Sequence, residues 1–455
     1  MDIPTSIFKS YDIRGVYPEE INEEIVRHIG AAYAQMIRQE SGIHRPKIVV
    51  GGDMRLSTPA LKKALITGLV LHGVEVVDVG LISTPTFYFA VAYYKYDGGV
   101  QVSASHNPKQ YNGLKMVRAG AAPIGKGNGM EEIERLAHLQ LPPTVPPGEV
   151  TNKKGILDDL MQAEVGDVPV KDIKPLTVVV DGANAMGSLD VEAIFKGLPV
   201  KLVKLNFQLD GNFPAHPADP LEPENLQQLS AAVIEHQADL GIAPDGDGDR
   251  YFFLDEKGVV IRQEILRGIM AQIALREHPG ATVCYDIRPG KITKDLIEEA
   301  GGKAIVTRVG HSHIKKAMLD SGAVFGGESS GHYFYQFPFG TFEAPAPLVL
   351  KFLVWVSQQN KPLSEAVQPY REKYHHSGEI NSNVASVPDA LARVKEKYAD
   401  GTLSELDGVT IEYPDFWFNV RGSNTEPLIR LNLEATSEQL MEQKRDEVLA
   451  VIRQG

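Results

Sequence analysis

The stretch KIVVGGDMRLSTPALKKALITGLVLHG (residues 47–73) decides the fold class, because it places a short apolar run directly before a turn and a helix. Glycines follow the apolar run, and Pro59 stands where the first turn of a helix accepts proline. After the proline, Leu61, Leu65 and Leu69 recur at helical spacing. The stretch therefore predicts a β-strand followed by an α-helix.

Two more stretches repeat this order, LTVVVDGANAMGS (176–188) and ATVCYDIRPGKITKDLIEEAGG (281–302). Strands that alternate with helices predict mostly parallel sheets covered by helices. Three occurrences indicate three related α/β domains. An earlier stretch, residues 19–39, has a regular apolar face and predicts a further helix.

The pattern changes after about residue 370. Residues 383–400 read as a helix, residues 408–423 as strands of alternating polarity, and residues 437–454 as a terminal amphipathic helix. This succession predicts a smaller C-terminal α+β domain. Pro-rich junctions such as LPPTVPPGEV (141–150) offer boundaries, and the expected domains are 1–148, 149–254, 255–367 and 368–455.

The bulk composition restricts the class of protein. With 455 residues the chain is too long for one hydrophobic core, and its 43% hydrophobic and 23% charged residues are ordinary for a globular protein. A formal charge of −13 argues against a broad nucleic-acid surface. The single cysteine, Cys284, excludes intramolecular disulfides and predicts a small buried residue. We find no membrane span or secretory signal, so we expect a cytoplasmic enzyme or binding protein.

The clearest chemical motif is PDGDGDRYFFLDE, in which Asp245, Asp247 and Asp249 alternate with glycines. Three carboxylates in a tight loop can converge on one hard cation. The alternative interpretation is an ordinary hairpin turn, in which Asp-Gly pairs are common. An EF-hand fails, because its sixth position needs glycine and here is Arg250. Three carboxylates with open coordination positions suit Mg²⁺ bound to phosphate oxygens.

A second motif, QVSASHNPKQYNGLK (101–115), places Ser105 on a sharp turn after an apolar run. Serine is a poor nucleophile without a base or a nearby positive charge, and a Ser-His hydrolase would favour a G-x-S-x-G context that is missing here. Neighbouring side chains normally point apart, so we expect His106 to be a poor base for Ser105. A serine that carries phosphate would need a cation, which the aspartate loop could provide.

Two more loops can bind polar ligands. VRGSNTEPLIRLNLEA (420–435) offers several side-chain donors and a glycine, as a phosphate clamp requires. FGGESSGHYFY (325–335) alternates Glu328, Ser330 and His332 and could bind vicinal sugar hydroxyls. Taken alone, each of these loops is also compatible with an ordinary turn.

Read together, these motifs resemble those of the α-D-phosphohexomutases, in the phosphomannomutase/phosphoglucomutase branch. The matching motifs occur in family order over nearly the whole chain: YDIRG (11–15), SASHNP (103–108), DGNFPAHPADP (210–220), DGDGDR (245–250), GESSGH (327–332) and RGSNTEPLIR (421–430). The resemblance implies four domains around a central cleft, three α/β and one smaller C-terminal α+β domain. It also implies a phosphohexomutase that interconverts hexose 1-phosphate and hexose 6-phosphate of mannose, glucose or both.

The resemblance further implies roles for individual residues. Ser105 would be phosphorylated, and a phosphoserine oxygen would join Asp245, Asp247 and Asp249 on Mg²⁺. A hexose 1,6-bisphosphate would be both intermediate and activator. The residues expected around the phosphoserine and sugar are Tyr11, Arg14, Lys115, Arg250, Arg288, His311 and His332, with Glu328 and Ser330 on hydroxyls and Arg421, Ser423, Asn424, Thr425 and Arg430 on the non-reacting phosphate.

Some questions stay open at this level. Lys115 and His311 are both candidates for the general acid/base, and Arg288 stands where relatives often carry lysine. YDIRG argues against the phosphoglucosamine branch. A metal-dependent sugar phosphatase, a phosphoglucosamine mutase and a non-catalytic sugar-phosphate-binding protein are the alternatives, and both a monomer and a homodimer are compatible with the sequence.

Overall fold

The computed structural model describes residues 3–139, 141–143, 145–166, 168–288, 290–422 and 428–454. The chain divides into two compact units, Met1–Val260 with Tyr333–Asn360, and Ile261–His332 with Lys361–Gly455. In the described part of the chain, no helix combines the length and the apolar character needed to cross a bilayer.

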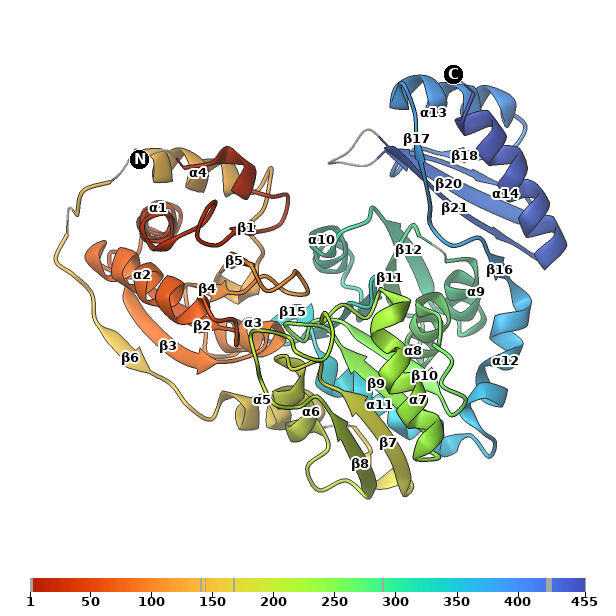
Figure 1. Cartoon of the computed structure of the whole chain (residues 1–455), viewed down its shortest axis with the longest axis horizontal. Coiled ribbons are helices and arrows are strands. Elements are labelled where there is room, and N and C mark those ends of the chain that lie inside the picture. Colours follow the sequence, from red (N-terminus) through yellow and green to blue (C-terminus); the bar gives the residue numbers. More distant parts are fainter. Residues whose placement is uncertain are drawn as a thin grey trace. The chain divides into compact units, whose positions relative to one another are not determined.

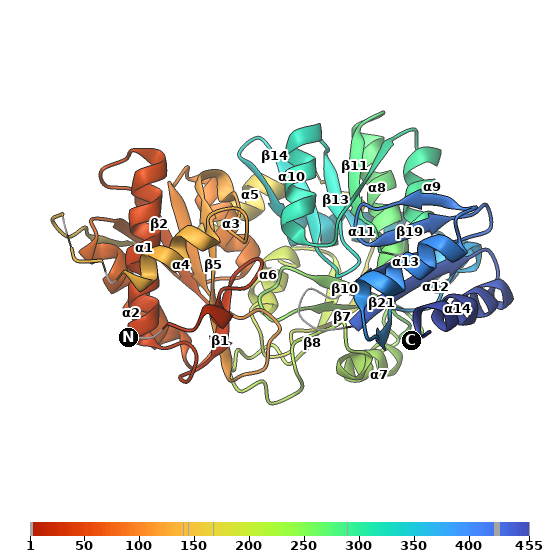
Figure 2. The same ribbon diagram turned by 90° about the horizontal axis from the view of Figure 1, so that it is seen from above.

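The first unit begins with a mixed, mostly parallel sheet. Its strands lie in the order β1 (Ile13–Val16), β5 (Tyr111–Arg118), β4 (Gly98–Val102), β2 (Lys47–Gly52), β3 (Glu75–Leu81) and β6 (Val150–Asn152). β2 is parallel to β3 and β4, whereas β5 is antiparallel to β4 and β1. In Figure 2, α1 (Glu23–Ser41) and α2 (Thr58–Leu71) lie on one side of the sheet and α3 (Thr84–Tyr93) on the other. α4 (Met130–His138) packs on α1.

The stretch that opened the sequence analysis folds as predicted. β2 is followed by α2, with Pro59 in the first turn of that helix. Leu61, Leu65 and Leu69 are fully buried. Because helices cover both faces of the sheet, the central strand reads as a continuous apolar run.

The helix expected over residues 19–39 starts later than predicted. α1 begins at Glu23, because the Asn22 side chain accepts a hydrogen bond from the Ile25 N–H at 3.1 Å and caps the helix. Residues 17–21 form turns and bends before this cap. The apolar spacing predicted the helix, and the capping residue determines where it starts.

The second sheet of the first unit has the order β10 (Tyr251–Asp255), β9 (Leu240–Pro244), β7 (Leu176–Asp181) and β8 (Val200–Leu205). β7 is parallel to β8 and β9, and β10 is antiparallel to β9. α7 (Gln227–Glu235) packs on β7 and β9. The same unit contains α5 (Ile156–Val165), α6 (Gly187–Ile194), the hairpin of β14 (Tyr333–Phe337) and β15 (Gly340–Glu343), and α11 (Pro345–Gln358).

The second unit starts with parallel strands β12 (Lys303–Thr307), β11 (Thr282–Asp286) and β13 (Phe325–Gly327). α10 (His311–Ser321) lies on one side of β11 and β12, and α9 (Lys291–Glu299) lies on the other (Figure 1). α8 (Gln263–Glu277) packs on α9, and α12 (Leu363–Lys373) contacts α8. Cys284 in β11 is fully buried, as predicted.

The C-terminal part of this unit is an antiparallel sheet with two helices on one side (Figure 1). Its strands are β16 (His375–His376), β17 (Ile380–Asn383), β18 (Thr402–Ser404), β19 (Val409–Glu412), β20 (Phe416–Gly422) and β21 (Leu428–Ala435). The helices are α13 (Val387–Lys397) and α14 (Glu438–Ile452). The predicted α+β class of this domain, and the α/β class of the earlier ones, are confirmed.

The motif loops occupy equivalent places in the topology. The serine loop joins β4 to antiparallel β5, and the aspartate loop joins β9 to antiparallel β10. The loop with Glu328 likewise follows parallel strand β13 and precedes β14. Each loop therefore begins at the carboxyl end of a parallel strand, where α/β sheets place ligand sites.

Candidate active site

Ser105 is held on a strained turn by backbone contacts. Its φ of +50° lies in the left-handed region that non-glycine residues rarely adopt, and the residue is only 3% exposed. The guanidinium of Arg55, also buried, donates to the Ser105 carbonyl at 2.8 Å and to the Pro108 carbonyl at 2.8 Å. Asp53 pairs with Arg55 at 3.2 Å. Since Arg55 binds carbonyl groups, the Ser105 hydroxyl stays available for chemistry.

The aspartate loop brings three carboxylates together. Oxygens of Asp245, Asp247 and Asp249 lie within 4.8 Å of one another, and all three residues are buried. Asp245 Oδ1 accepts hydrogen bonds from the backbone N–H groups of Gly248 at 3.0 Å and Asp249 at 3.1 Å. Gly248 has a φ of +77°, so glycine is needed where the loop turns. The alternation of aspartate and glycine thus builds the cluster.

The serine loop and the aspartate loop meet. Ser105 Oγ lies 3.2 Å from Asp245 Oδ2 and donates a hydrogen bond to it. A Cβ on Gly246 would lie 2.3 Å from the Ser105 carbonyl oxygen, so only glycine permits this approach. The serine–aspartate region is defined here as Ser105, Lys115, Asp245, Asp247 and Asp249. The structure thus brings the serine and the three aspartates together in one place.

The donor set of this region fits a divalent cation. Burial, with the charges of Asp249 and Asp247, raises the pKa of Asp245 well above its usual value. Among the described residues, Asp247 Oδ1 is buried without a hydrogen-bond partner, whereas Asp247 Oδ2 accepts from Thr84 Oγ1 at 2.5 Å. Oxygen-only ligands with a spare carboxylate oxygen are what a hard cation requires.

Basic side chains surround the same region. Lys115 Nζ contacts Asp247 Oδ2 at 2.6 Å and Asp249 Oδ2 at 2.7 Å. Burial favours the neutral amine, but the two carboxylates outweigh it and raise the pKa of Lys115 well above its usual value. Arg250 Nε lies 3.7 Å from Asp245 Oδ2, and Arg14 donates to the Asn107 side chain within the serine loop. Tyr11 precedes β1 and is half-buried.

The expectation that His106 would point away from Ser105 is wrong. His106 Nδ1 lies 3.2 Å from Ser105 Oγ. The left-handed backbone of Ser105 turns the two neighbouring side chains toward the same side, which an extended chain would not do. Burial, together with the charges of Arg250 and Arg14, lowers the pKa of His106 to about 2. The ring is therefore neutral and can accept a hydrogen bond.

In the second unit, the loop after β13 forms a compact polar cluster. Glu328 Oε2 lies 3.1 Å from His332 Nδ1 and accepts from Ser330 Oγ at 3.3 Å. The Gly310 N–H, one residue before His311, donates to Glu328 Oε1 at 2.8 Å. Burial opposes ionisation, but His332, followed by the charges of Arg288 and His311, lowers the pKa of Glu328 well below its usual value.

His311 and Arg288 belong to the same cluster. The rings of His311 and His332 have centroids 6.1 Å apart and are nearly parallel. Arg288 Nε donates to Asp286 Oδ2 at 2.6 Å, and its NH2 group lies 3.9 Å from Glu328 Oε1. The structure therefore groups Arg288, His311, Glu328, Ser330 and His332.

The clamp loop lies between β20 and β21. Arg421 and Arg430 are direct cross-strand neighbours, and both guanidinium groups bind Glu379, at 2.9 and 3.2 Å. Like charges opposite each other destabilise a sheet, so the Glu379 carboxylate offsets their repulsion. The arginine–glutamate region is defined here as Glu379, Arg421 and Arg430. Ser423, Asn424 and Thr425, also expected in the clamp, lie outside the described residues.

Comparisons with known proteins identify the family. Models for the phosphoglucomutase/phosphomannomutase domains match in order: alpha/beta/alpha domain I over residues 5–140, domain II over 158–258, domain III over 264–374 and the C-terminal domain over 379–451. The chain belongs to the phosphoglucomutase/phosphomannomutase family. The family predicted from the sequence motifs, an enzyme family of four domains, is confirmed.

Individual members of the phosphoglucomutase/phosphomannomutase family match over nearly their full length. The chain is 38% identical to a phosphomannomutase of Escherichia coli K12 and 39% identical to a protein named phosphohexose mutases of Xanthomonas campestris, covering 98% of this chain and 99% of each relative. A solved phosphoglucomutase/phosphomannomutase family protein of Burkholderia thailandensis is 32% identical, with a TM-score of 0.88 over 99% of this chain and 98% of that one.

Some residues of these regions were missed by sequence reasoning. Arg55 and Thr84 contact the serine and aspartate loops, and Glu379 binds both clamp arginines. The role of Arg55 could have been inferred from GGDMR, where Asp53 and Arg55 form a charged pair directly after an apolar strand. Thr84 and Glu379 lie far along the chain from their partners and carry no local motif.

Proposed function

We propose that this chain is a phosphohexomutase that interconverts hexose 1-phosphate and hexose 6-phosphate, with mannose, glucose or both as the sugar. The observation that carries the proposal is the 3.2 Å contact between Ser105 Oγ and Asp245 Oδ2 in a buried cluster of three carboxylates. A hydroxyl beside a cation site suits a serine that accepts and donates a phosphoryl group.

Asp245, Asp247, Asp249 and a phosphate oxygen on Ser105 would hold Mg²⁺. When bound, the cation would neutralise charge on the phosphoryl oxygens. The guanidinium groups of Arg14 and Arg250 would support the same charge neutralisation, because Arg14 donates to Asn107 in the serine loop and Arg250 Nε lies 3.7 Å from Asp245 Oδ2. Arg55 would keep the Ser105 backbone in place through the step.

The chemical step is a transfer between two oxygens. A free hydroxyl of the hexose monophosphate forms a bond to the phosphorus while the bond from Ser105 Oγ to phosphorus breaks, and the hydroxyl proton passes to a base. His311 remains the candidate for that base, whereas Lys115, which Asp247 and Asp249 keep protonated, would be the acid that gives a proton to the departing Ser105 Oγ. The resulting hexose 1,6-bisphosphate would turn over and return its other phosphoryl group to Ser105, which explains why a bisphosphate would act as activator.

The second unit would supply sugar and phosphate recognition. Glu328 and Ser330 are suited to sugar hydroxyls, since a carboxylate accepts hydrogen bonds and a serine hydroxyl can both donate and accept them. Arg421 and Arg430 are suited to the phosphate that does not react. The remaining proposed contacts are Tyr11, Arg288, His332, Ser423, Asn424 and Thr425.

Ser105→Ala tests the proposal. We expect the rate of hexose 1-phosphate to 6-phosphate conversion, with a trace of hexose 1,6-bisphosphate, to fall by about a thousandfold or more, because no nucleophile remains. The fold should persist, since Arg55 binds the backbone of Ser105 and not its hydroxyl. Intact-mass analysis should find one phosphate on the unmodified enzyme and none on the variant.

Ser230→Ala is the matched control, because the Ser230 hydroxyl donates to the Gly258 carbonyl and to no other group among the described residues. Near-normal conversion by Ser105→Ala would refute the phosphoserine mechanism. Stoichiometric release of inorganic phosphate by the unmodified enzyme would instead identify a sugar phosphatase.

A further inference from the structure

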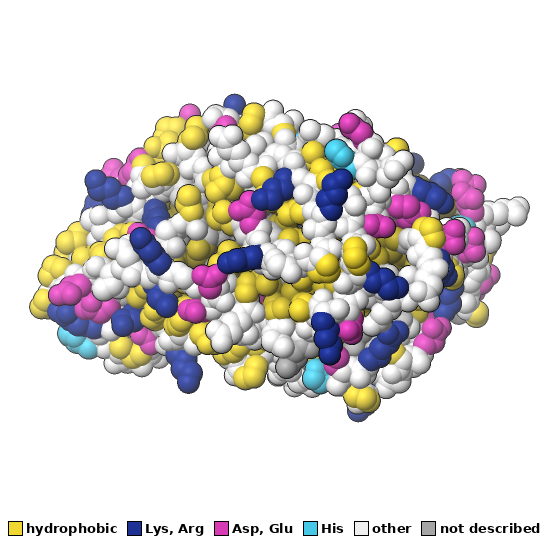
Figure 3. Space-filling view, turned by 90° about the horizontal axis from the view of Figure 1, so that it is seen from below, with side chains coloured by type: hydrophobic (Ala, Val, Ile, Leu, Met, Phe, Trp, Pro, Cys, Tyr) yellow, Lys and Arg dark blue, Asp and Glu magenta, His cyan; other side chains and the backbone are white. Residues whose placement is uncertain are grey.

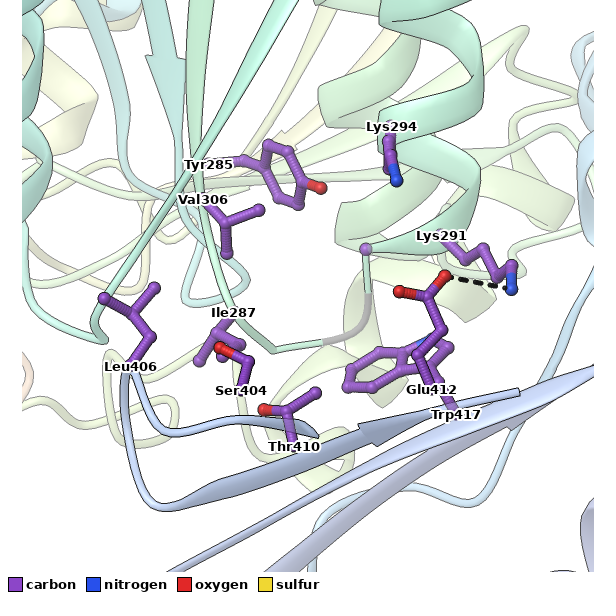
Figure 4. A pocket seen from close by; sticks show the side chains of 11 residues that line it. Tyr285, Ile287, Lys291, Lys294, Val306, Ser404, Leu406, Thr410, Glu412 and Trp417 are labelled. Atoms are coloured by element: carbon purple, nitrogen blue, oxygen red, sulfur yellow. Dashed lines mark hydrogen bonds and ion pairs between the residues drawn. The ribbon is translucent and has the colours of Figure 1, made fainter. Parts of the chain in front are cut away.

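A pocket of about 170 Å³ in the second unit lies outside both regions described above. One wall comes from the third domain, with Tyr285, Ile287, Lys294 and Val306, and the other comes from the C-terminal sheet, with Leu406 and Trp417 among its residues. Figure 4 shows these side chains around an open space. Its volume is close to the roughly 150 Å³ of an engineered protein cavity that binds benzene.

The lining has an apolar part that suits a flat ring. Ile287, Val306 and Leu406 lie together on one side of the space, and Trp417 lies across its base (Figure 4). The indole N–H of Trp417 already donates to Glu434 at 2.6 Å, so the ring presents only its apolar surface to the pocket. Val306 is 37% exposed, which is unusual for a valine on a parallel strand.

The polar part of the lining suits an anion. Lys294 Nζ and the Tyr285 hydroxyl both point toward the space (Figure 4). None of the described residues forms a hydrogen bond or an ion pair with the Lys294 ammonium, whereas the Lys294 backbone N–H donates to the Gly290 carbonyl at the start of α9. Burial raises the pKa of the Tyr285 hydroxyl, which keeps it a donor. The acid on the rim, Glu412, is already paired with Lys291 at 3.4 Å.

The pocket also lies behind loops that carry residues of the proposed sugar site. Ile287 and Gly290 flank Arg288, and β12 continues from Val306 toward His311. At the rim, Arg308 Nε donates to the Leu406 carbonyl at 2.7 Å and the Val309 N–H donates to Asp407 at 3.1 Å. An occupant would contact both walls and so stabilise their present arrangement.

We propose that this pocket binds a small aryl carboxylate, with its ring between Val306, Leu406 and Trp417 and its carboxylate on Lys294 Nζ and the Tyr285 hydroxyl. Such a ligand is an effector and not a substrate. By holding the C-terminal domain against the loops of Arg288 and His311, it changes the affinity of the enzyme for phosphorylated sugar.

Binding of 4-(trifluoromethyl)benzoate, followed by ¹⁹F NMR on the full chain, tests the site. We expect saturable binding that Lys294→Met weakens by about tenfold, because one charge-assisted hydrogen bond is lost. The neutral 4-(trifluoromethyl)benzamide should bind about tenfold more weakly than the benzoate for the same reason. Thr410→Phe, which fills the pocket from β19, should abolish binding.

Lys63→Met is the matched control, because Lys63 is an exposed lysine on α2 in the other unit. Benzoate binding that survives both Lys294→Met and Thr410→Phe would overturn the proposal, as would equal affinity for benzoate and benzamide. Complete displacement of the benzoate by inorganic phosphate would overturn it too, since the probe would then occupy a phosphate site.

The effect on activity is measured separately. Saturating benzoate should change the KM for hexose 1-phosphate by at least about twofold in the unmodified enzyme and leave it unchanged in Lys294→Met. This second measurement rests on the proposed mutase function, whereas the NMR measurement does not. Binding at the pocket with no change in KM would therefore overturn the effector role while the ligand site stands.

Discussion

The serine–aspartate region and the arginine–glutamate region handle charge in opposite ways. In the first, three buried carboxylates crowd around one lysine, and Asp247 Oδ1 has no hydrogen-bond partner among the described residues. In the second, two guanidinium groups share one carboxylate, Glu379. The first region has negative charge to spare and the second has positive charge to spare. The charges of the serine–aspartate region therefore suit a cation, and those of the arginine–glutamate region suit an anion.

The two regions also differ in how firmly they are built. The aspartate loop is closed by backbone hydrogen bonds to Asp245 and by the close approach of Gly246 to Ser105. The charges of Arg421 and Arg430 are balanced by a single side chain, Glu379, which lies in the connection between β16 and β17 and can be displaced by a ligand. If the proposed function holds, an incoming phosphate would share or replace the Glu379 carboxylate at the two arginines. At Asp247, Lys115 is the one cationic side chain that the described residues place in contact with the carboxylate.

The mixed charge of the surface contrasts with both regions. On the face drawn in Figure 3, Lys and Arg side chains lie among Asp and Glu side chains. Mixed signs on a surface largely cancel at a distance. On this face, selective attraction of a charged ligand would therefore depend on local sets of charge and not on the surface as a whole.

Of the substitutions that test the difference between the two regions, Asp247→Asn has the largest expected effect. The substitution keeps the shape but removes a charge from the cluster, so we expect the affinity for Mg²⁺ and kcat each to fall by about a hundredfold or more. The thermal unfolding midpoint without Mg²⁺ should rise, because repulsion among the carboxylates decreases. Calorimetric titration of Mg²⁺, initial rates and thermal scans measure these effects.

Asp172→Asn is the control for this change, since Asp172 is exposed and far along the chain from the cluster. An Asp247→Asn variant that binds Mg²⁺ as tightly as the unmodified enzyme would show that the cluster is not the cation site. A lower unfolding midpoint without Mg²⁺ would show that Lys115 already balances the cluster.

Arg421→Ala sharpens the other side of the comparison. Loss of a guanidinium from the clamp should raise the KM for hexose 1-phosphate by about ten- to a hundredfold, as expected for a charge-assisted contact. The affinity for Mg²⁺ should stay the same, because Arg421 belongs to the other unit. Steady-state kinetics and Mg²⁺ titration on the same preparation separate the two effects.

Arg453→Ala provides a matched loss of a guanidinium, because Arg453 follows α14 and, within the part of the chain that the structure describes, its guanidinium donates only to Ser382 Oγ at 3.1 Å. An unchanged KM in Arg421→Ala would contradict the clamp assignment. A parallel loss of Mg²⁺ affinity would mean that the variant had disturbed the fold.

The sequence predicted the secondary-structure elements better than it predicted which side chains contact one another. Apolar spacing was enough for α2 and β2, and alternating aspartates and glycines were enough for the cluster of three carboxylates, because these patterns are local. The contact of His106 with Ser105 depends on a left-handed φ that no residue type announces. Glu379 meets Arg421 only because β17 and β20 both flank β21, which is a property of the topology.

The smallest expected effect is at His216, which forms an ion pair with Asp181 outside both regions. Its Nε2 lies 2.9 Å from Asp181 Oδ2 and its Nδ1 lies 2.9 Å from the Pro217 carbonyl, so both ring nitrogens face acceptors. The hydrogen bond with Asp181, opposed by burial, raises the pKa of His216 above its usual value. Its stabilisation is therefore complete below the unfolded pKa of about 6.5 and is lost as the pH rises through the higher folded pKa.

We expect the thermal unfolding midpoint of His216→Gln to lie below that of the unmodified chain at pH 5.5 and to approach it by pH 8.5. The difference in unfolding free energy should be about 1 kcal/mol or less, since His216 is partly exposed to solvent. His44→Gln, at an exposed histidine, should show no such trend. A difference that stays constant over this pH range would mean that His216 stabilises the fold by packing alone. The ion pair with Asp181 would then add nothing measurable to the free energy of unfolding.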